Sequence, residues 1–222
     1  MSLSKPRLKE LKRAVNYCLL SYVDNFVSDD IQTDSKGNDN WIWQWNEDNK
    51  TLDFSVRGTD DLADVLKDIS IYPKRLKGVG LVCAGFLEGA EKALDYTLAQ
   101  FLNASENGYQ ITLSGHSYGG AIVQIMQQIL RVEHNIKTSC ISFGSPRIWL
   151  PFASPKGRHL RVHIETDPIT YLPFFTGHIM RIYKHRASEH IELEKEGWFM
   201  KAEDHYLTTY QSIIEGLYAK SN

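Results

Sequence analysis

Ser117 stands at the centre of the pattern G-x-S-x-G, which residues 115–119 form between a stretch of strand character and a stretch of helical character. At a strand-to-helix junction this pattern predicts a sharp turn that holds the serine hydroxyl above the edge of a sheet. Side chains two residues before and after the serine would collide in such a turn, so Gly115 and Gly119 are required. The following helix directs free N–H groups and the positive end of its dipole toward a developing oxyanion. We therefore predict that Ser117 is a nucleophile.

Motifs for metals and nucleotides are missing from the sequence. It contains no H-E-x-x-H, no P-loop and no G-x-G-x-x-G. The three cysteines, Cys18, Cys83 and Cys140, lie far apart and form no Cys-x-x-Cys pair. This spacing argues against a zinc site and against a disulfide framework. We expect no metal, no cofactor, and cysteines that are reduced and buried.

Length and composition are those of one globular domain. Of the 222 residues, 42% are hydrophobic and 23% are charged. A chain of this length buries roughly 70–75% of the surface that its unfolded form exposes, which supports a core and a recessed site. The 25 basic and 27 acidic residues give a net charge of -2. Such a balance produces no strong field of either sign, so we expect no nucleic-acid partner.

The N-terminal region looks like a signal peptide only superficially, with a basic run at residues 5–13 before an apolar-looking stretch. Leu8, Leu11 and Val15 begin an apolar stripe at helical spacing that continues to Phe26, and no small-residue cleavage site follows. We predict a packed first helix, with contact between a basic amphipathic helix and an anionic membrane as the alternative. No run approaches the ~20 apolar residues of a membrane span. We therefore expect a cytoplasmic protein without stable membrane insertion.

Strand and helix patterns alternate along the chain. Strands are predicted at residues 41–45, 51–56, 109–114, 138–143 and 160–165, with weaker patterns at 178–183 and 191–194. Helices are predicted at residues 61–72, 86–103, 119–132 and 205–218, and loops at 28–40 and 74–80. This alternation indicates an α/β protein with a largely parallel central sheet. With no repeat or linker, we expect a single domain over residues 1–222.

Further motifs accompany the serine pattern in a fixed order. They are V-R-G-T at 56–59, D-V-L-K-D-I at 64–69, V-C-A-G-F at 82–86, G-H-S-Y-G-G at 115–120, F-G-S-P-R at 143–147, D-P-I-T-Y-L-P at 167–173 and D-H-Y-L-T-T-Y at 204–210. From about residue 41 to the C-terminal helix, the sequence resembles the class 3 lipase family, which includes fungal triacylglycerol lipases and feruloyl esterases. The resemblance implies an α/β-hydrolase fold, with a mostly parallel sheet flanked by helices.

The resemblance also implies roles for individual residues. Ser117 would attack an ester carbonyl, His205 would take its proton, and Asp167 would orient the imidazole and stabilise its charged form. The order serine, aspartate, histidine is that of α/β-hydrolases. The oxyanion hole would be formed by Thr59, through its backbone N–H and its hydroxyl, and by the backbone N–H of Tyr118.

Three positions depart from the family pattern. Cys83 replaces a histidine, Val65 a tryptophan, and Thr170 the first proline of the acid motif. None of these is a member of the implied triad, so the chemistry should survive. Residues 60–77 follow the predicted strand 51–56 and the oxyanion residue Thr59, at the place where lids lie in the family. We take them as a candidate lid, and the departures from the family pattern put the behaviour of this lid in question.

Other residues compete for the same roles. His178 follows the acid motif closely and is the alternative base. Glu165 belongs to a predicted strand, and Asp204 is better interpreted as a helix cap, so both are weaker candidates for the acid. His116 is expected to serve in packing, because its family counterpart points away from the nucleophile. His163 is expected to be structural or on the surface, and the remaining histidines to be solvated, namely His134, His159, His185 and His190.

The expected function is hydrolysis of carboxylic esters through an acyl-enzyme, with acylglycerols, phospholipids or similar lipid esters as substrates and transient contact with a lipid interface. One alternative is a hydrolase-like fold without catalysis that binds partners or lipid. A second is acyl transfer to an alcohol other than water, which would use the same triad.

Overall fold

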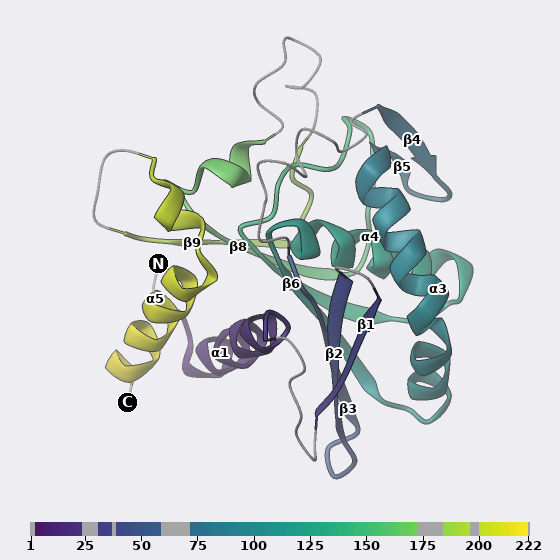
Figure 1. Ribbon diagram of the computed structural model, residues 1–222, viewed down its shortest axis with the longest axis horizontal. Helices are drawn as coiled ribbons and strands as arrows, with labels where there is room; N and C mark the ends of the chain where they lie inside the picture. The colour runs from purple at the N-terminus through teal and green to yellow at the C-terminus, as the bar shows by residue number, and fades with distance from the viewer. Residues whose placement is uncertain are drawn as a thin grey trace.

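The computed structural model describes residues 3–23, 31–36, 39–58, 72–172, 184–195 and 200–221 (Figure 1). In chain order the main elements are α1 (Lys5–Leu20), β1 (Ile31–Lys36), β2 (Asp39–Asn46), β3 (Thr51–Val56), β4 (Pro73–Leu76), β5 (Gly80–Cys83), α3 (Ala84–Glu106), β6 (Gln110–His116), α4 (Ser117–Glu133), β7 (Thr138–Phe143), β8 (Arg158–Ile164), β9 (Glu189–Leu193) and α5 (Leu207–Lys220). Short 3-10 helices occupy Pro168–Tyr171 and Ala202–His205.

The central sheet has seven strands in the order β1-β2-β3-β6-β7-β8-β9. Strands β3, β6, β7, β8 and β9 pair in parallel, whereas β1, β2 and β3 form an antiparallel meander. In parallel strands the carboxyl ends meet at one edge of the sheet, so β6 and β8 deliver the residues that follow them to that edge. The predicted α/β class and the mostly parallel sheet are confirmed.

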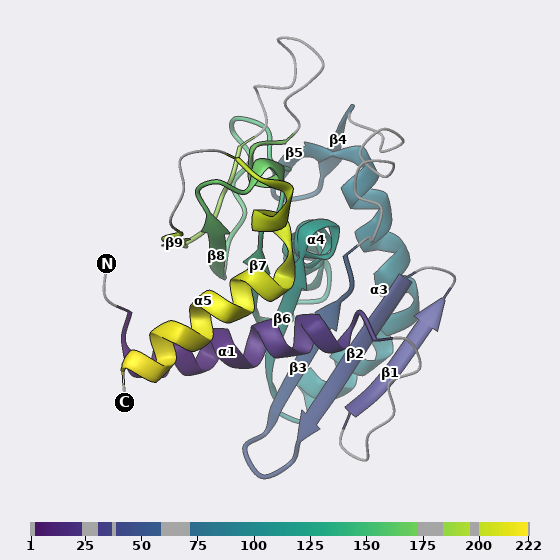
Figure 2. The ribbon, with the colours of Figure 1, turned by 60° about the vertical axis from the view of Figure 1, so that its left-hand side comes forward.

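Helices cover the two faces of the sheet. On one face α3 and α4 pack over a core that includes Phe54, Leu113 and Trp149. On the other face α1 and α5 lie side by side over a second core, drawn from β7, β8 and β9 (Figure 2). The central strands are therefore covered by a buried core on both faces of the sheet.

Two segments predicted to be loops contain strands. Within the predicted loop 28–40, residues 31–36 pair with β2 as an edge strand. Within the predicted loop 74–80, β4 pairs with β5 in a separate two-stranded antiparallel sheet. Both predictions were wrong because polar and glycine-rich residues indicate turns locally, while an edge strand satisfies its backbone by hydrogen bonds to its neighbour that need no apolar pattern.

Some predicted elements cannot be compared with the fold. The predicted helix 61–72 and the weaker strand 178–183 lie outside the described residues, apart from Tyr72. The same holds for most of the candidate lid 60–77, whose described part consists of Tyr72, β4 and Lys77. Among the helices that are described, none has both the length and the apolar character needed to cross a bilayer.

The C-terminal helix starts later than predicted. His205 ends the 3-10 helix Ala202–His205, and α5 begins at Leu207. Asp204 does not cap a helix, contrary to the expectation, because its carboxylate forms an ion pair with Lys195. A charged partner on a neighbouring segment satisfies a buried carboxylate better than the backbone N–H groups of a short turn.

Candidate active site

Ser117 lies at the junction of β6 and α4, where its backbone has a φ of 56°. A Cβ at Gly115 would come within 2.4 Å of the carbonyl oxygen of Gly119, and a Cβ at Gly119 within 2.3 Å of that of Val56. The predicted sharp turn, and the need for glycine on both sides of it, are thus confirmed. The left-handed conformation is costly for serine and occurs at sites where the surrounding structure enforces it.

Asp167 and His205 are joined directly. The Nδ1 atom of His205 lies 3.0 Å and 2.9 Å from the two carboxylate oxygens of Asp167. A carboxylate accepts hydrogen bonds, so Nδ1 carries the proton and Nε2 keeps its lone pair. This is the tautomer in which an imidazole accepts a proton from a serine hydroxyl.

The carboxylate of Asp167 is buried but fully partnered. The backbone N–H of Ile169 donates to its Oδ1 at 2.9 Å, and the hydroxyl of Tyr210 donates to its Oδ2 at 2.6 Å. Burial and the nearby carboxylate raise the pKa of Tyr210 well above its ordinary value, which keeps the hydroxyl protonated and able to donate. Three donors, on His205, Ile169 and Tyr210, thus replace the hydrogen bonds from water that the carboxylate loses on burial.

Two residues of this cluster escaped the sequence analysis. Tyr210 entered the sequence analysis only as the last residue of the D-H-Y-L-T-T-Y motif, five residues after His205, and had no role in the triad. Gly144 adopts a φ of 56°, and a Cβ there would lie 2.8 Å from Oδ2 of Asp167 and 3.2 Å from Cε1 of His205. The glycine of the F-G-S-P-R motif is therefore needed by the acid–base pair, and the motif itself was the available signal.

The reactive atoms of serine and histidine are not hydrogen-bonded to each other. Both Oγ of Ser117 and Nε2 of His205 are buried, and neither has a hydrogen-bond partner among the described residues. The two residues nevertheless share a neighbourhood, because the ring of His116 lies 4.6 Å from that of His205. Catalytic hydrogen bonds are often long in proteins without substrate and tighten in the complex.

Of the two predicted oxyanion residues, the structure describes Tyr118 but not Thr59. Thr59 lies outside the described residues, but Gly58 before it packs against the serine, since a Cβ on Gly58 would lie 3.3 Å from Cβ of Ser117. Tyr118 is the second residue of α4, and its backbone N–H therefore belongs to the first turn of the helix. Gly58, two residues after the end of β3, thus lies beside the serine, and Tyr118 follows it in α4.

The other histidines follow the sequence predictions in part. His159 and His185 were expected to be solvated, but burial lowers the pKa of His159 to about 4, and the ring of His185 contacts the carbonyl oxygen of Thr170 at 2.7 Å. Polar neighbours in the sequence hid the burial of His159, whose Nδ1 lies 3.2 Å from the carbonyl oxygen of Arg186. His163 pairs with Glu192 across β8 and β9. The alternative base, His178, lies outside the described residues.

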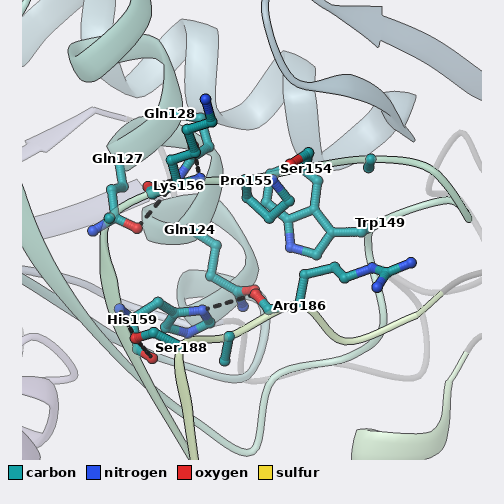
Figure 3. Close-up of a pocket in the computed structure, with 13 residues that line it drawn as sticks. Gln124, Gln127, Gln128, Trp149, Ser154, Pro155, Lys156, His159, Arg186 and Ser188 are labelled. Carbon is teal, nitrogen blue, oxygen red and sulfur yellow. Dashed lines mark hydrogen bonds between the residues drawn. The ribbon is translucent and has the colours of Figure 1, made fainter.

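A pocket of about 280 Å³ lies beside α4 and is separate from these residues (Figure 3). Its floor includes Gln127 and Gln128, whose carboxamides bind backbone groups of the chain beside them. Gln127 donates to the carbonyl oxygens of Thr138 and Arg158, and Gln128 exchanges hydrogen bonds with the backbone of Lys156. These bonds hold the chain before β8 against α4.

Metal ligands do not gather in the described part of the chain, which has no group of three or more His, Cys, Asp or Glu side chains arranged around a common centre. The three cysteines are free and buried, as predicted. The residues that do converge are a serine in a strained turn and an imidazole held by a buried carboxylate.

Comparison with known proteins agrees with this geometry. The family model described as lipase (class 3) matches residues 54–177, more than half of the chain. No curated protein matches the sequence.

Solved structures with a similar fold come from fungi. The chain is similar to the triacylglyceride lipase of Rhizomucor miehei, with a TM-score of 0.72 and 17% identity over 93% of this chain and 96% of that one. For lipase II of Rhizopus niveus the TM-score is 0.65, with 21% identity over 78% and 77% of the two chains. For a triacylglycerol lipase described as having a serine protease triad as its catalytic centre, the TM-score is 0.74, with 17% identity over 92% of this chain and 95% of that one.

Proposed function

The chain belongs to the class 3 lipase family, and we propose that Ser117, His205 and Asp167 are the triad with which it hydrolyses esters. Its family and its α/β-hydrolase fold make it a serine hydrolase of lipid esters. The observation that carries the assignment of residues is the contact of His205 Nδ1 with both carboxylate oxygens of Asp167, which leaves Nε2 free to accept a proton.

The first half of the reaction is acylation. His205 Nε2 takes the proton of the Ser117 hydroxyl as Oγ attacks the ester carbonyl, and the carbonyl oxygen gains negative charge. Asp167 stabilises the imidazolium that forms, without taking its proton. His205 then gives that proton to the alcohol oxygen as the C–O bond breaks, which leaves the acyl group on Ser117.

The second half is deacylation. A water molecule attacks the acyl-enzyme carbonyl, with His205 again as the base, and the acid is released as Ser117 regains its proton. In both halves the developing oxyanion would lie at the backbone N–H of Tyr118 and at Thr59. Each such donor contributes a factor of about 10²–10³ to the rate.

The substrate class forms the finer part of the proposal. Acyl esters of glycerol and phospholipids fit a family of lipases, and transient contact with a lipid interface would present them to the site. An ester series from acetate to oleate, assayed with and without a lipid interface, tests this part. A preference for short soluble esters that is independent of the interface would contradict it.

The catalytic assignment is tested by Ser117→Ala. This variant should fold and lose p-nitrophenyl ester hydrolysis, and a fluorophosphonate probe should label Ser117 in the native protein only. Full activity in Ser117→Ala would overturn the assignment. A native protein that neither hydrolyses esters nor reacts with the probe would instead be a hydrolase-like binding protein, and product partitioning toward added alcohols would reveal acyl transfer.

A further inference from the structure

His116 is the last residue of β6, and both of its ring nitrogens are engaged. Its Nε2 lies 2.8 Å from the backbone carbonyl oxygen of His205, and its Nδ1 lies 2.9 Å from the hydroxyl of Tyr22. The side chain is buried, with 5% of the residue exposed. A buried imidazole with two partners that are distant in sequence is more than a filler of the core.

The direction of each hydrogen bond follows from the chemistry of the partners. A carbonyl oxygen only accepts, so Nε2 of His116 carries a proton and donates it to His205. Burial lowers the pKa of His116 well below its ordinary value, so the ring is neutral and Nδ1 has a lone pair. The hydroxyl of Tyr22 therefore donates to Nδ1. One chain of donors runs from Tyr22 through His116 to His205.

This chain of hydrogen bonds connects different parts of the site. His116 adjoins Ser117 and pairs with Phe143 in the sheet, so its position is as firm as that of the nucleophile. Tyr22 follows α1, outside the matched residues 54–177, and its hydroxyl lies 2.2 Å from where a Cβ on Gly58 would be. Gly58 in turn precedes the predicted oxyanion residue.

His205 needs such a hold, because it ends a short 3-10 helix, a kind of turn with few internal hydrogen bonds of good geometry. Asp167 binds the ring at Nδ1 and thereby sets its tautomer and rotation. The hydrogen bond from His116 to the carbonyl oxygen of His205 sets the position of the His205 backbone relative to the sharp turn at Ser117, which we call the elbow. Together the two contacts determine where Nε2 lies with respect to Ser117.

We infer that Tyr22 and His116 are positioning residues, which hold the backbone of His205 at the distance from Ser117 that proton transfer requires. The inference rests on the proposed function, since it concerns the same triad. Neither residue is hydrogen-bonded to Oγ of Ser117 or to Nε2 of His205, so their effect should appear in the rate of the chemical step rather than in substrate binding.

Three variants test this inference, with p-nitrophenyl ester kinetics and the rate of fluorophosphonate labelling as readouts. His116→Leu removes both hydrogen bonds and should lower kcat and the labelling rate by about 10–100-fold, with KM changed by less than about twofold, because small misplacement of a base is costly. His116→Gln keeps an N–H donor near the position of Nε2 and should stay within about threefold of the native kcat. Tyr22→Phe should lower kcat by about 3–10-fold.

Two controls separate positioning from general damage. Tyr206→Phe removes a hydroxyl next to His205 on an exposed side chain and should leave kcat at the native value. His159→Gln changes a buried histidine remote from the triad, and it should lower stability without a comparable loss of kcat. Stability of every variant is measured by urea unfolding.

The outcomes are decisive in either direction. Native kcat in folded His116→Leu, or losses in His116→Gln as large as those in His116→Leu, would overturn the inference. If His116→Leu does not fold, native kcat in Tyr22→Phe would overturn it, and a reduced kcat with native KM would support it. A fully active Ser117→Ala would instead overturn the proposed function, and an inactive Ser117→Ala beside an active His116→Leu would remove this inference alone.

Discussion

The hydroxyl of Tyr210 donates a hydrogen bond of 2.6 Å to the Oδ2 atom of Asp167, and both groups are completely buried. The same hydroxyl accepts the backbone N–H of Ile164, at the end of β8. Tyr210 therefore ties the C-terminal helix to the strand that precedes the acid. It also supplies one of the donors that let a carboxylate remain charged in the core.

Replacing Tyr210 with phenylalanine should affect both stability and catalysis. The change leaves a buried carboxylate with one donor fewer and the N–H of Ile164 without a partner, at a cost of roughly 1–3 kcal/mol in the free energy of unfolding. We expect a several-fold decrease in kcat as well. Urea unfolding and ester kinetics measure the two effects, with Tyr218→Phe as the matched control. A Tyr210→Phe protein as stable as the native one would refute this account.

The charge of Asp167, and its role as a hydrogen-bond acceptor only, should matter more than its size. Asp167→Asn keeps the size but presents an amide that can donate to Nδ1, which favours the wrong tautomer of His205. We expect kcat to fall by about 10³–10⁴-fold while the protein stays folded. Steady-state kinetics together with circular dichroism check this, and a loss of less than tenfold would argue against the assigned acid.

The glycines of the elbow should tolerate no side chain. A methyl group at Gly119 would lie 2.3 Å from the carbonyl oxygen of Val56, so Gly119→Ala forces β3 and α4 apart and should destabilise the fold by several kcal/mol. Gly216→Ala is the matched control, because a Cβ there meets nothing within 4 Å in α5 and should stabilise the helix by about 0.5–1 kcal/mol. Denaturant midpoints compare the two, and equal effects of both changes would contradict the elbow geometry.

Stability should fall in mild acid because of His159. Burial lowers its pKa to about 4, whereas the unfolded chain takes up a proton near the ordinary value of 6.5. Between these two pH values the unfolded state binds more protons, so this contribution to the free energy of unfolding decreases as the pH falls from 6.5 to about 4.

The comparison of variants isolates that contribution. Urea unfolding of His159→Gln across this pH range should show a shallower dependence of the free energy of unfolding on pH than the native protein does. His163 contributes in the same direction, since its pKa is also lowered to about 4. An unchanged slope in His159→Gln would show that the buried ring is not the cause.

The sequence by itself determined the elbow, the α/β class and the order of the elements. Each of these follows from a local pattern, namely the glycine spacing around Ser117 and the alternation of strand and helix patterns along the chain. The strand β7 begins and ends where the pattern predicted. Local patterns also gave wrong predictions at β1 and β4, which were predicted as loops, because backbone pairing in these strands does not depend on side-chain type.

Only the tertiary structure decided which partners the site residues have. Tyr210 meets Asp167 across 43 positions of sequence, and His116 meets His205 across 89, through helices and strands whose packing no short pattern encodes. The same packing made His159 a buried residue despite its polar neighbours. A hydrogen bond needs two atoms within about 3 Å, and in a folded chain that proximity is set by how whole elements pack on both faces of the sheet.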